Sequence, residues 1–138
     1  MADYSGRTDL AVGDIAQADA EIQEYEVDTG GVTKGQIVYL SANGKIKFTS
    51  VAAEIGIGVA LQTKAAGLMC SVCTRGKVKV TAGGAIAAGG SVRGSTAGKA
   101  LANPYAADIT MVDKNMAYRT DTVDVCADGD LILIKVVR

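Results

Sequence analysis

The chain has 138 residues, a formal net charge of −1 and 49% hydrophobic residues, a combination that predicts one compact domain. Its aromatic residues are five tyrosines and one phenylalanine, and it has no block of basic residues, so the charged and stacking surfaces of nucleic-acid-binding proteins are missing. No stretch reaches the ~18 apolar residues of a membrane-spanning helix, so we expect neither a nucleic-acid partner nor a membrane partner.

We interpret residues 1–20 as an extended N-terminal arm, because they show no sustained hydrophobic period. They also lack the basic start and apolar run of a signal peptide, so we expect the chain to be intracellular at synthesis. Residues 1–28 contain eight acidic residues against Arg7 alone, whereas residues 29–138 contain 13 basic and 7 acidic residues. Such a segment is either a solvated tail or an arm that lies on a basic surface, on its own body or on a neighbouring subunit.

The segment after the arm carries the first strand and hairpin signals. A short helix within residues 15–25 is one possibility, because Ala and Glu are frequent there. The alternation of Ile22, Glu24 and Glu26 with Tyr25 and Val27 equally fits a first strand, which we prefer. Residues 36–40 and 45–48 flank Asn43-Gly44, a dipeptide that tolerates positive φ and indicates a β-hairpin. Residues 53–62 are apolar on both faces, which predicts a central strand, and their glycines indicate a bend or a close backbone approach.

The rest of the chain continues the same pattern, with turn signals roughly every 8–12 residues. We expect strands at residues 68–74, 77–80, 91–93, 109–113, 116–119 and 131–137, the last of them buried. We expect turns at Arg75-Gly76 and at residues 95–99, an Ala/Gly linker at residues 81–90 and irregular structure at residues 100–107. This spacing predicts an all-β fold, a compact β-sandwich or barrel-like domain over residues 21–138.

The sequence also repeats itself. The segment from Gly31 to Val38, with the following Gly44-Lys45, resembles the segment from Ala85 to Val92 with Gly98-Lys99, at an offset of 54 residues. Residues 65–72 resemble residues 127–134 at an offset of 62. We therefore expect two pseudo-repeats within one domain, at about residues 31–80 and 85–138. The repeated residues are turn formers and apolar residues, which build a scaffold.

The sequence contains no residue pattern that predicts a catalytic site. The chain has no histidine, and its carboxylates fall in the arm or in turns, so no general acid–base or nucleophilic constellation is predicted. The segment from Gly94 to Ala100 superficially resembles a phosphate-binding loop, but one residue too few separates its glycines and alanine follows Lys99. We expect a protein that is not an enzyme and that holds no cofactor and no metal.

The three cysteines are expected to be buried apolar side chains. Cys70 and Cys73 form a C-x-x-C pair inside a predicted strand, where positions three apart point to opposite faces. No second pair and no histidine complete a set of four zinc ligands. Cys126 precedes the last strand and receives the same interpretation.

The chain resembles a family of small tailed-phage head proteins, the capsid decoration proteins, long catalogued as a domain of unknown function and sometimes labelled phage recombinase. The resemblance rests on the order and spacing of four segments, residues 32–40, 56–61, 65–67 and 76–89. The second half matches less well, because Met116-Ala117-Tyr118-Arg119 replaces a Gly-Val-Ala-Leu-like strand of the family. A recombinase would need a nucleotide site, which the loop at residues 94–100 does not provide.

The resemblance implies a decoration or cementing protein that binds the outer surface of an icosahedral head, stabilises it and forms a homotrimer. Its partners would be the major capsid protein and further copies of itself, and it would be made in the host cytoplasm. The N-terminal arm would contact the coat or a neighbouring copy, through residues that include Asp3, Tyr4, Arg7, Asp9, Leu10, Val12 and Asp14. Two alternatives stay open: another virion component, such as a spike or tail accessory, and a small-ligand-binding β module.

Overall fold

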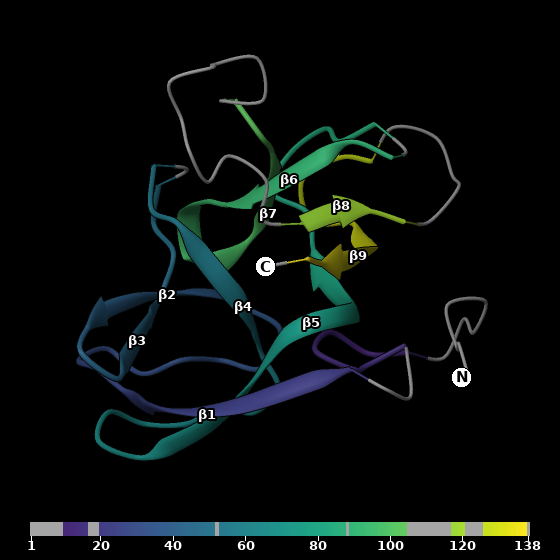
Figure 1. Cartoon of the computed structure of the whole chain (residues 1–138). Helices are drawn as coiled ribbons and strands as arrows, with labels where there is room; N and C mark the ends of the chain where they lie inside the picture. Colours follow the sequence, from purple (N-terminus) through teal and green to yellow (C-terminus); the bar gives the residue numbers. More distant parts are fainter. Residues whose placement is uncertain are drawn as a thin grey trace.

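The computed structural model describes residues 10–16, 20–51, 53–87, 89–104, 117–120 and 126–137. Within these residues the chain forms strands and one short 3₁₀-helix but no α-helix, which confirms the predicted all-β fold (Figure 1). The strands are β1 (Glu21–Val27), β2 (Ile37–Ala42), β3 (Lys45–Phe48), β4 (Gly56–Ala60), β5 (Met69–Thr81), β6 (Ser91–Gly94), β7 (Ala100–Ala102), β8 (Ala117–Arg119) and β9 (Leu131–Val136); the 3₁₀-helix η1 spans Thr96–Gly98.

The first five strands close into a barrel in the order β1–β3–β2–β4–β5, because β1 pairs with both β3 and β5. The hairpin predicted at Asn43-Gly44 is confirmed and joins β2 to β3. The predicted central strand is β4, which lies between β2 and β5. Alternate side chains of these strands fill the barrel, and the buried set is Val27, Val32, Val38, Ile46, Ala60, Cys70 and Val72.

The remaining strands form a second ring in the order β5–β9–β8–β6–β7. A parallel bridge between Ala82 and Ala100 connects β7 back to the residue that follows β5 and completes this ring. The second core is larger, and it includes Ile37 and Val59, which project into it from the outward faces of the first barrel. It therefore joins the two rings as well as filling the second one.

Strand β5 belongs to both rings (Figure 1). Its first half pairs with β1 up to Arg75, and its second half pairs with β9 from Gly76 onward. The turn predicted at Arg75-Gly76 is wrong, since the chain runs through these residues as one strand of 13 residues. Gly76 has φ 130°, a value that favours glycine, so the residue interpreted as a turn former allows the strand to change partners.

The pairing register repeats along with the sequence. In the first ring Val38 lies opposite Phe48, and in the second Val92 lies opposite Ala102, both 54 positions further on. The β1–β5 pair of Glu26 and Met69 corresponds to the β5–β9 pair of Thr81 and Leu131, so the β5 residue is shifted by 62 positions and the β1 residue by 55. The sequence offsets of 54 and 62 therefore recur between equivalent pairs in two rings of the same topology.

Close backbone approaches pack the structure tightly at two glycines. A β-carbon on Gly58 would lie 2.2 Å from the carbonyl oxygen of Cys73, which confirms the predicted close approach in this strand. A β-carbon on Gly94 would lie 2.4 Å from Thr49 Oγ1, where β6 crosses the end of the first hairpin. Protein interiors of this density leave no room for an added methyl group.

Two further predictions need correction or lie outside the described residues. Residues 100–107 were expected to be irregular, but Ala100–Ala102 form β7, whose pairing with β6 repeats that of β3 with β2. The strand predicted at residues 109–113 lies outside the described residues. The strands predicted at residues 22–27, 116–119 and 131–137 are confirmed as β1, β8 and β9 within one or two residues.

Candidate interaction surfaces

Residues 10–16, which we call the seated segment, lie along the outer edge of β5. Ile15 forms an antiparallel bridge with Val78. The Gly13 amide donates to the Lys79 carbonyl (2.7 Å), the Lys79 amide donates to the Asp14 carbonyl (3.0 Å), and the Ala16 amide donates to the Lys77 carbonyl (2.9 Å). The segment thus adds a short strand to the second half of β5, where β1 and β9 leave one edge uncovered.

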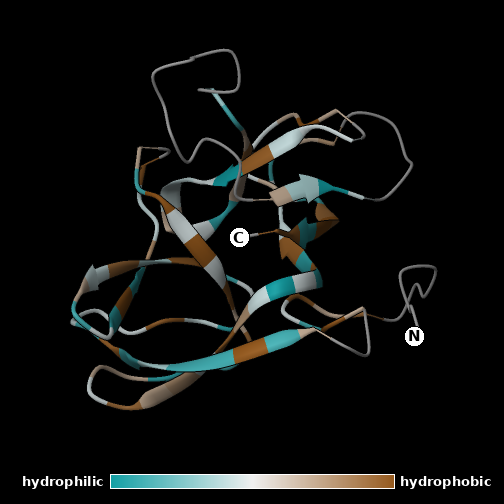
Figure 2. Ribbon diagram, viewed as in Figure 1, coloured by the Kyte–Doolittle hydropathy of each residue, from teal (hydrophilic) through white to brown (hydrophobic). Residues whose placement is uncertain are grey.

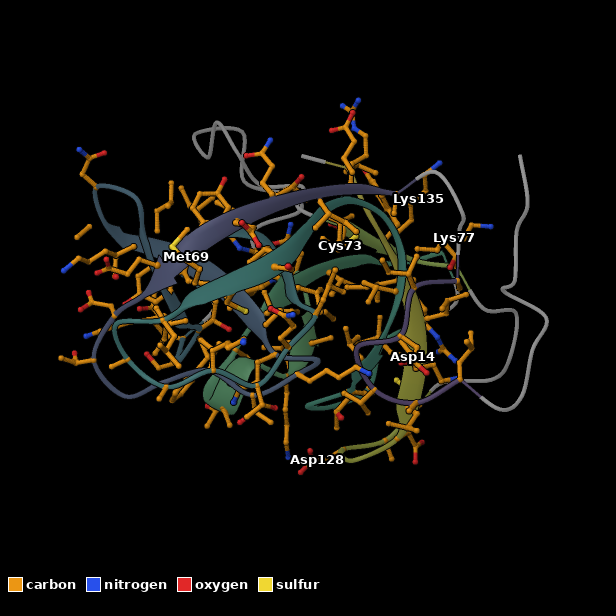
Figure 3. All side chains as sticks on the ribbon, turned by 90° about the horizontal axis from the view of Figure 1, so that it is seen from below. Asp14, Met69, Cys73, Lys77, Asp128 and Lys135 are labelled. Carbon is orange, nitrogen blue, oxygen red and sulfur yellow. The ribbon has the colours of Figure 1, made fainter. Side chains whose placement is uncertain are left out.

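Side chains hold the seated segment as well. The Asp14 carboxylate lies 2.8 Å from the Lys34 ammonium and accepts a hydrogen bond from the Ala11 amide (2.8 Å). Val12 packs on the backbone of Gly35, and Ala16 is fully buried. Figure 3 shows Asp14 on the same side of the molecule as Lys77, with Met69 at the opposite end of β5.

Of the seven residues predicted to bind a partner, three lie in the seated segment and four lie outside the described residues. Leu10, Val12 and Asp14 lie in the seated segment, whose described contacts are with this domain. The other four, Asp3, Tyr4, Arg7 and Asp9, lie outside the described residues. For Asp14 the basic partner is Lys34 of its own chain, one of the two arrangements that the charge pattern allowed.

An apolar groove of about 440 Å³ lies where β2 passes the segment that leads into β4. Leu40 and Ile55 line it and are 49% and 40% exposed, and Val51 nearby is 54% exposed. Sequence reasoning missed this surface. The only signal was a pair of apolar residues, Val51 and Ile55, in a segment between two strands, and scattered exposed apolar residues are common on protein surfaces.

Tyr39 and Glu54 supply the polar groups of this groove. Partial burial tends to raise the pKa of the Glu54 carboxyl, but hydrogen bonds from the Ser50 and Val51 amides, the Ser50 hydroxyl and the Tyr39 phenol outweigh it and hold the pKa below its usual value. The same contact with Glu54 raises the pKa of Tyr39, because the phenol must stay protonated to donate. The groove therefore presents an ionised carboxylate beside an apolar floor at neutral pH.

The loop that superficially resembled a phosphate-binding motif is a closed turn. The Ser95 amide donates to the Lys99 carbonyl (2.8 Å), the Gly98 amide to the Thr49 carbonyl (2.9 Å) and the Lys99 amide to the Thr96 carbonyl (3.2 Å). A phosphate loop uses such amides to hold the anion. Here they are already bonded within the protein, and the Lys99 ammonium lies 3.2 Å from the Asp128 carboxylate.

The cysteines are buried and free. Cys70 belongs to the core of the first barrel, whereas Cys73, three positions along β5, lies on the strand's other face. Burial raises the pKa of both thiols, that of Cys73 to about 11. In the described part of the chain, no three Cys, Asp or Glu side chains are placed to hold a metal ion, and no helix is long and apolar enough to cross a membrane.

Comparison with known proteins gives a likeness of fold. No protein-family model and no curated protein sequence matches the chain. Among solved structures, it is similar to the N-terminal base of the head fiber gp8.5 of bacteriophage phi29, with a TM-score of 0.60 and 14% sequence identity. The match covers 85% of this chain and 93% of the phi29 chain. The resemblance to capsid decoration proteins stays a prediction, and the chain shares its doubled β fold with the base of a phage head fiber.

Proposed function

We propose that this chain is a non-enzymatic structural protein of a tailed-phage virion, which decorates the outer surface of the head and stabilises it. The observation that carries the proposal is the fold likeness to the base of a phage head fiber, which extends over 85% of the chain. The independent sequence resemblance to capsid decoration proteins supports the same assignment. Both point to a protein whose work is attachment to a shell.

The architecture suits attachment. Two rings that share β5 and a common core give a rigid body, and the pairing of β1 with both β3 and β5 closes the first ring. The groove beside Leu40 and Ile55 offers an apolar surface with an ionised carboxylate at Glu54. Apolar surface with a few placed polar groups is typical of protein interfaces.

The proposed partners are the major capsid protein and two further copies of this chain in a homotrimer. A trimer would present three equal surfaces to the shell, so moderate contacts add up through avidity. We also propose that the N-terminal arm contributes to shell binding. Because residues 10–16 contact their own domain, this role falls mainly to Asp3, Tyr4, Arg7 and Asp9.

The test is the composition of purified virus particles from the source of the chain. We expect the protein in intact heads at a ratio to the coat subunit near that of a regular surface lattice, measured by quantitative mass spectrometry. Particles stripped of it should rebind the recombinant protein and regain resistance to heat. Absence from particles, or turnover of a substrate by the isolated protein, would overturn the proposal.

A second candidate is the base of a head-attached fiber or spike, which the phi29 likeness specifically favours. In that case the chain would anchor a longer structure and would not coat the shell. Electron microscopy of labelled particles separates the two roles, because a decoration protein covers the whole lattice whereas a fiber base marks discrete projections.

A further inference from the structure

The two rings have equivalent outer edges, and the described residues cover only one of them. Ile22 and Glu24 of β1 occupy the positions that Lys77 and Lys79 occupy in β5, since Ile22 pairs with Cys73 as Lys77 pairs with Lys135. The seated segment bonds to the backbone of Lys77 and Lys79. Along β1, the described pairing on this side is limited to Glu26 and Val27, which pair with β3.

We call the outer edge of β1 at residues 21–25 the bare edge, and its backbone groups point outward. The Glu26 amide donates to the Gly44 carbonyl on the β3 side, and the Val27 amide donates to the Leu68 carbonyl on the β5 side. Because amides alternate in direction along a strand, the amide and carbonyl of Glu24 and the carbonyl of Ile22 face the β3 side as well. No described residue accepts from or donates to them there. These are the counterparts of the groups that the seated segment uses on β5.

The bare edge is exposed and acidic. All four residues from Glu21 to Glu24 are exposed, and Ile22 keeps 50% of its surface accessible. Glu26 pairs with Lys45 (3.3 Å), whereas Glu21 and Glu24 have no ion pair within the described residues. Figure 2 shows β1 coloured mostly hydrophilic, with a hydrophobic band. The edge thus offers two unpaired carboxylates around one apolar side chain.

We propose that the outer edge of β1 at residues 21–25 binds an extended, lysine- or arginine-bearing segment of a partner protein, which adds as an antiparallel strand. This deepens the proposed function and rests on it for the identity of that partner, a protein of the virion. Charge complementarity selects the occupant: the equivalent edge is basic, with Lys77 and Lys79, and its segment carries Asp14. The acidic β1 edge requires the opposite sign.

Two other occupants fit the charges less well. Residues 1–9 of another copy carry Asp3 and Asp9 against Arg7, so they offer no excess of positive charge. Two β1 edges paired with each other would bring Glu21 and Glu24 against the same glutamates. Like charges directly opposite each other destabilise strand pairing.

The test uses blocked peptides as probes and reads the amide of Glu24. An eight-residue peptide of alternating lysine and valine should bind the free protein and slow hydrogen exchange of the Glu24 amide by about tenfold or more. The Lys79 amide, already bonded to the seated segment, should be slow with and without the peptide. The same peptide with glutamate in place of lysine, and a lysine peptide N-methylated at alternate residues, should have no effect.

Variants show whether binding occurs at this edge. Glu24→Lys with Glu21→Lys should abolish protection by the lysine peptide, whereas Asp128→Lys, a charge reversal at another exposed carboxylate on the other ring, should leave it intact. Glu24→Pro should also abolish binding of the lysine peptide, because proline removes the outward amide at a position where an edge strand tolerates proline. Since this variant has no amide at position 24, its binding is measured by titration calorimetry. If Glu24→Pro does not fold, the lysine variants at positions 21, 24 and 128 still decide whether the peptide binds at this edge.

The outcomes separate this inference from the proposed function. Unchanged exchange at Glu24 with the lysine peptide would overturn the edge proposal, even if the protein is found in virions. Protection at Glu24 that appears with rising protein concentration and no peptide would overturn the choice of occupant in favour of a second copy. Binding of the lysine peptide by a protein absent from particles would support the edge and remove only its assignment to a virion partner.

Discussion

Val12 packs on Gly35 so closely that a β-carbon at position 35 would lie 1.8 Å from the Val12 Cγ1 atom. Gly35 also has φ 92°, a conformation that favours glycine. This contact fixes the start of the seated segment against the loop that precedes β2. It explains why the segment lies on β5 with only a few backbone hydrogen bonds.

Gly35→Ala should therefore displace the seated segment. We expect faster hydrogen exchange at the Ala16 amide and easier proteolysis before residue 16, because the new methyl group occupies the position of Val12. Gly129→Ala is the matched control, since Gly129 has the same φ of 92° but no atom within 4 Å of its β-carbon position. Both changes add backbone strain of roughly 1–2 kcal/mol. Equal exchange at Ala16 in the two variants would contradict the packing role.

Gly94→Ala tests the contact between the rings. Its methyl group would meet Thr49 Oγ1 at 2.4 Å and Ile37 Cγ2 at 2.7 Å, in a place where Thr49 donates to the Ser95 carbonyl (3.0 Å). We expect the free energy of unfolding to fall by about 1–3 kcal/mol in urea titrations, as for other overpacked cores.

The control for this change is Gly84→Ala. Its nearest neighbour would be the flexible Leu101 Cδ1 atom at 3.3 Å, so a shift of a few tenths of an ångström relieves the contact. A loss of stability as large at position 84 as at position 94 would mean that the effect is not specific to the junction of the rings.

The buried thiols should resist chemical modification. Desolvation raises the pKa of Cys73 to about 11 and raises that of Cys70, so the reactive thiolate is scarce at pH 8. We expect iodoacetamide to label neither residue in the folded protein and both in 6 M guanidinium chloride, as measured by peptide mass spectrometry. Rapid labelling of Cys73 in the folded protein would show that β5 opens locally there.

The contribution of Glu54 to stability should decrease as the pH becomes acidic. Its pKa is held below the usual glutamate value, so its contribution to stability is present above that usual value and is lost as the pH falls through the lower, folded-state pKa. Glu54→Gln should therefore lose stability at pH 7 and lose less on acidification than the parent protein. Thermal unfolding between pH 3 and pH 7 measures both.

The comparison variant is Glu24→Gln, whose carboxylate accepts no hydrogen bond in the described part of the chain. It should follow the parent profile. If Glu54→Gln and Glu24→Gln reduce the pH dependence of stability equally, the hydrogen bonds to Glu54 are not the cause of that dependence.

The architecture of the rings was largely predictable from sequence, because turn chemistry and repetition are local signals. Asn43-Gly44 placed the first hairpin correctly, and the pairing of β6 with β7 lies at the same 54-residue offset from it as the repeated sequence segments. The prediction failed at Gly76, where the same glycine preference for unusual φ serves a change of pairing partner inside a continuous strand. It also failed at Ala100–Ala102, whose two alanines carry little strand propensity and depend on β6 for their conformation.

The candidate surfaces were less predictable. The position of the seated segment depends on a contact between Val12 and Gly35, and the groove depends on Leu40 and Ile55 coming together across a loop. Neither contact produces a periodic pattern in the sequence from which it could be predicted. The bare edge of β1 becomes visible only when its equivalent on β5 is known to be covered, which requires coordinates for both rings.

The shared strand gives the molecule a mechanical property. Pulling the two rings apart along β5 would strip β1 from one half of the strand and β9 from the other, because the partners change at Arg75 and Gly76 with no linker between them. The halves therefore lack a hinge at this strand. Force applied to one ring should pass to the other through peptide bonds and a common core, so that the domain yields as one unit.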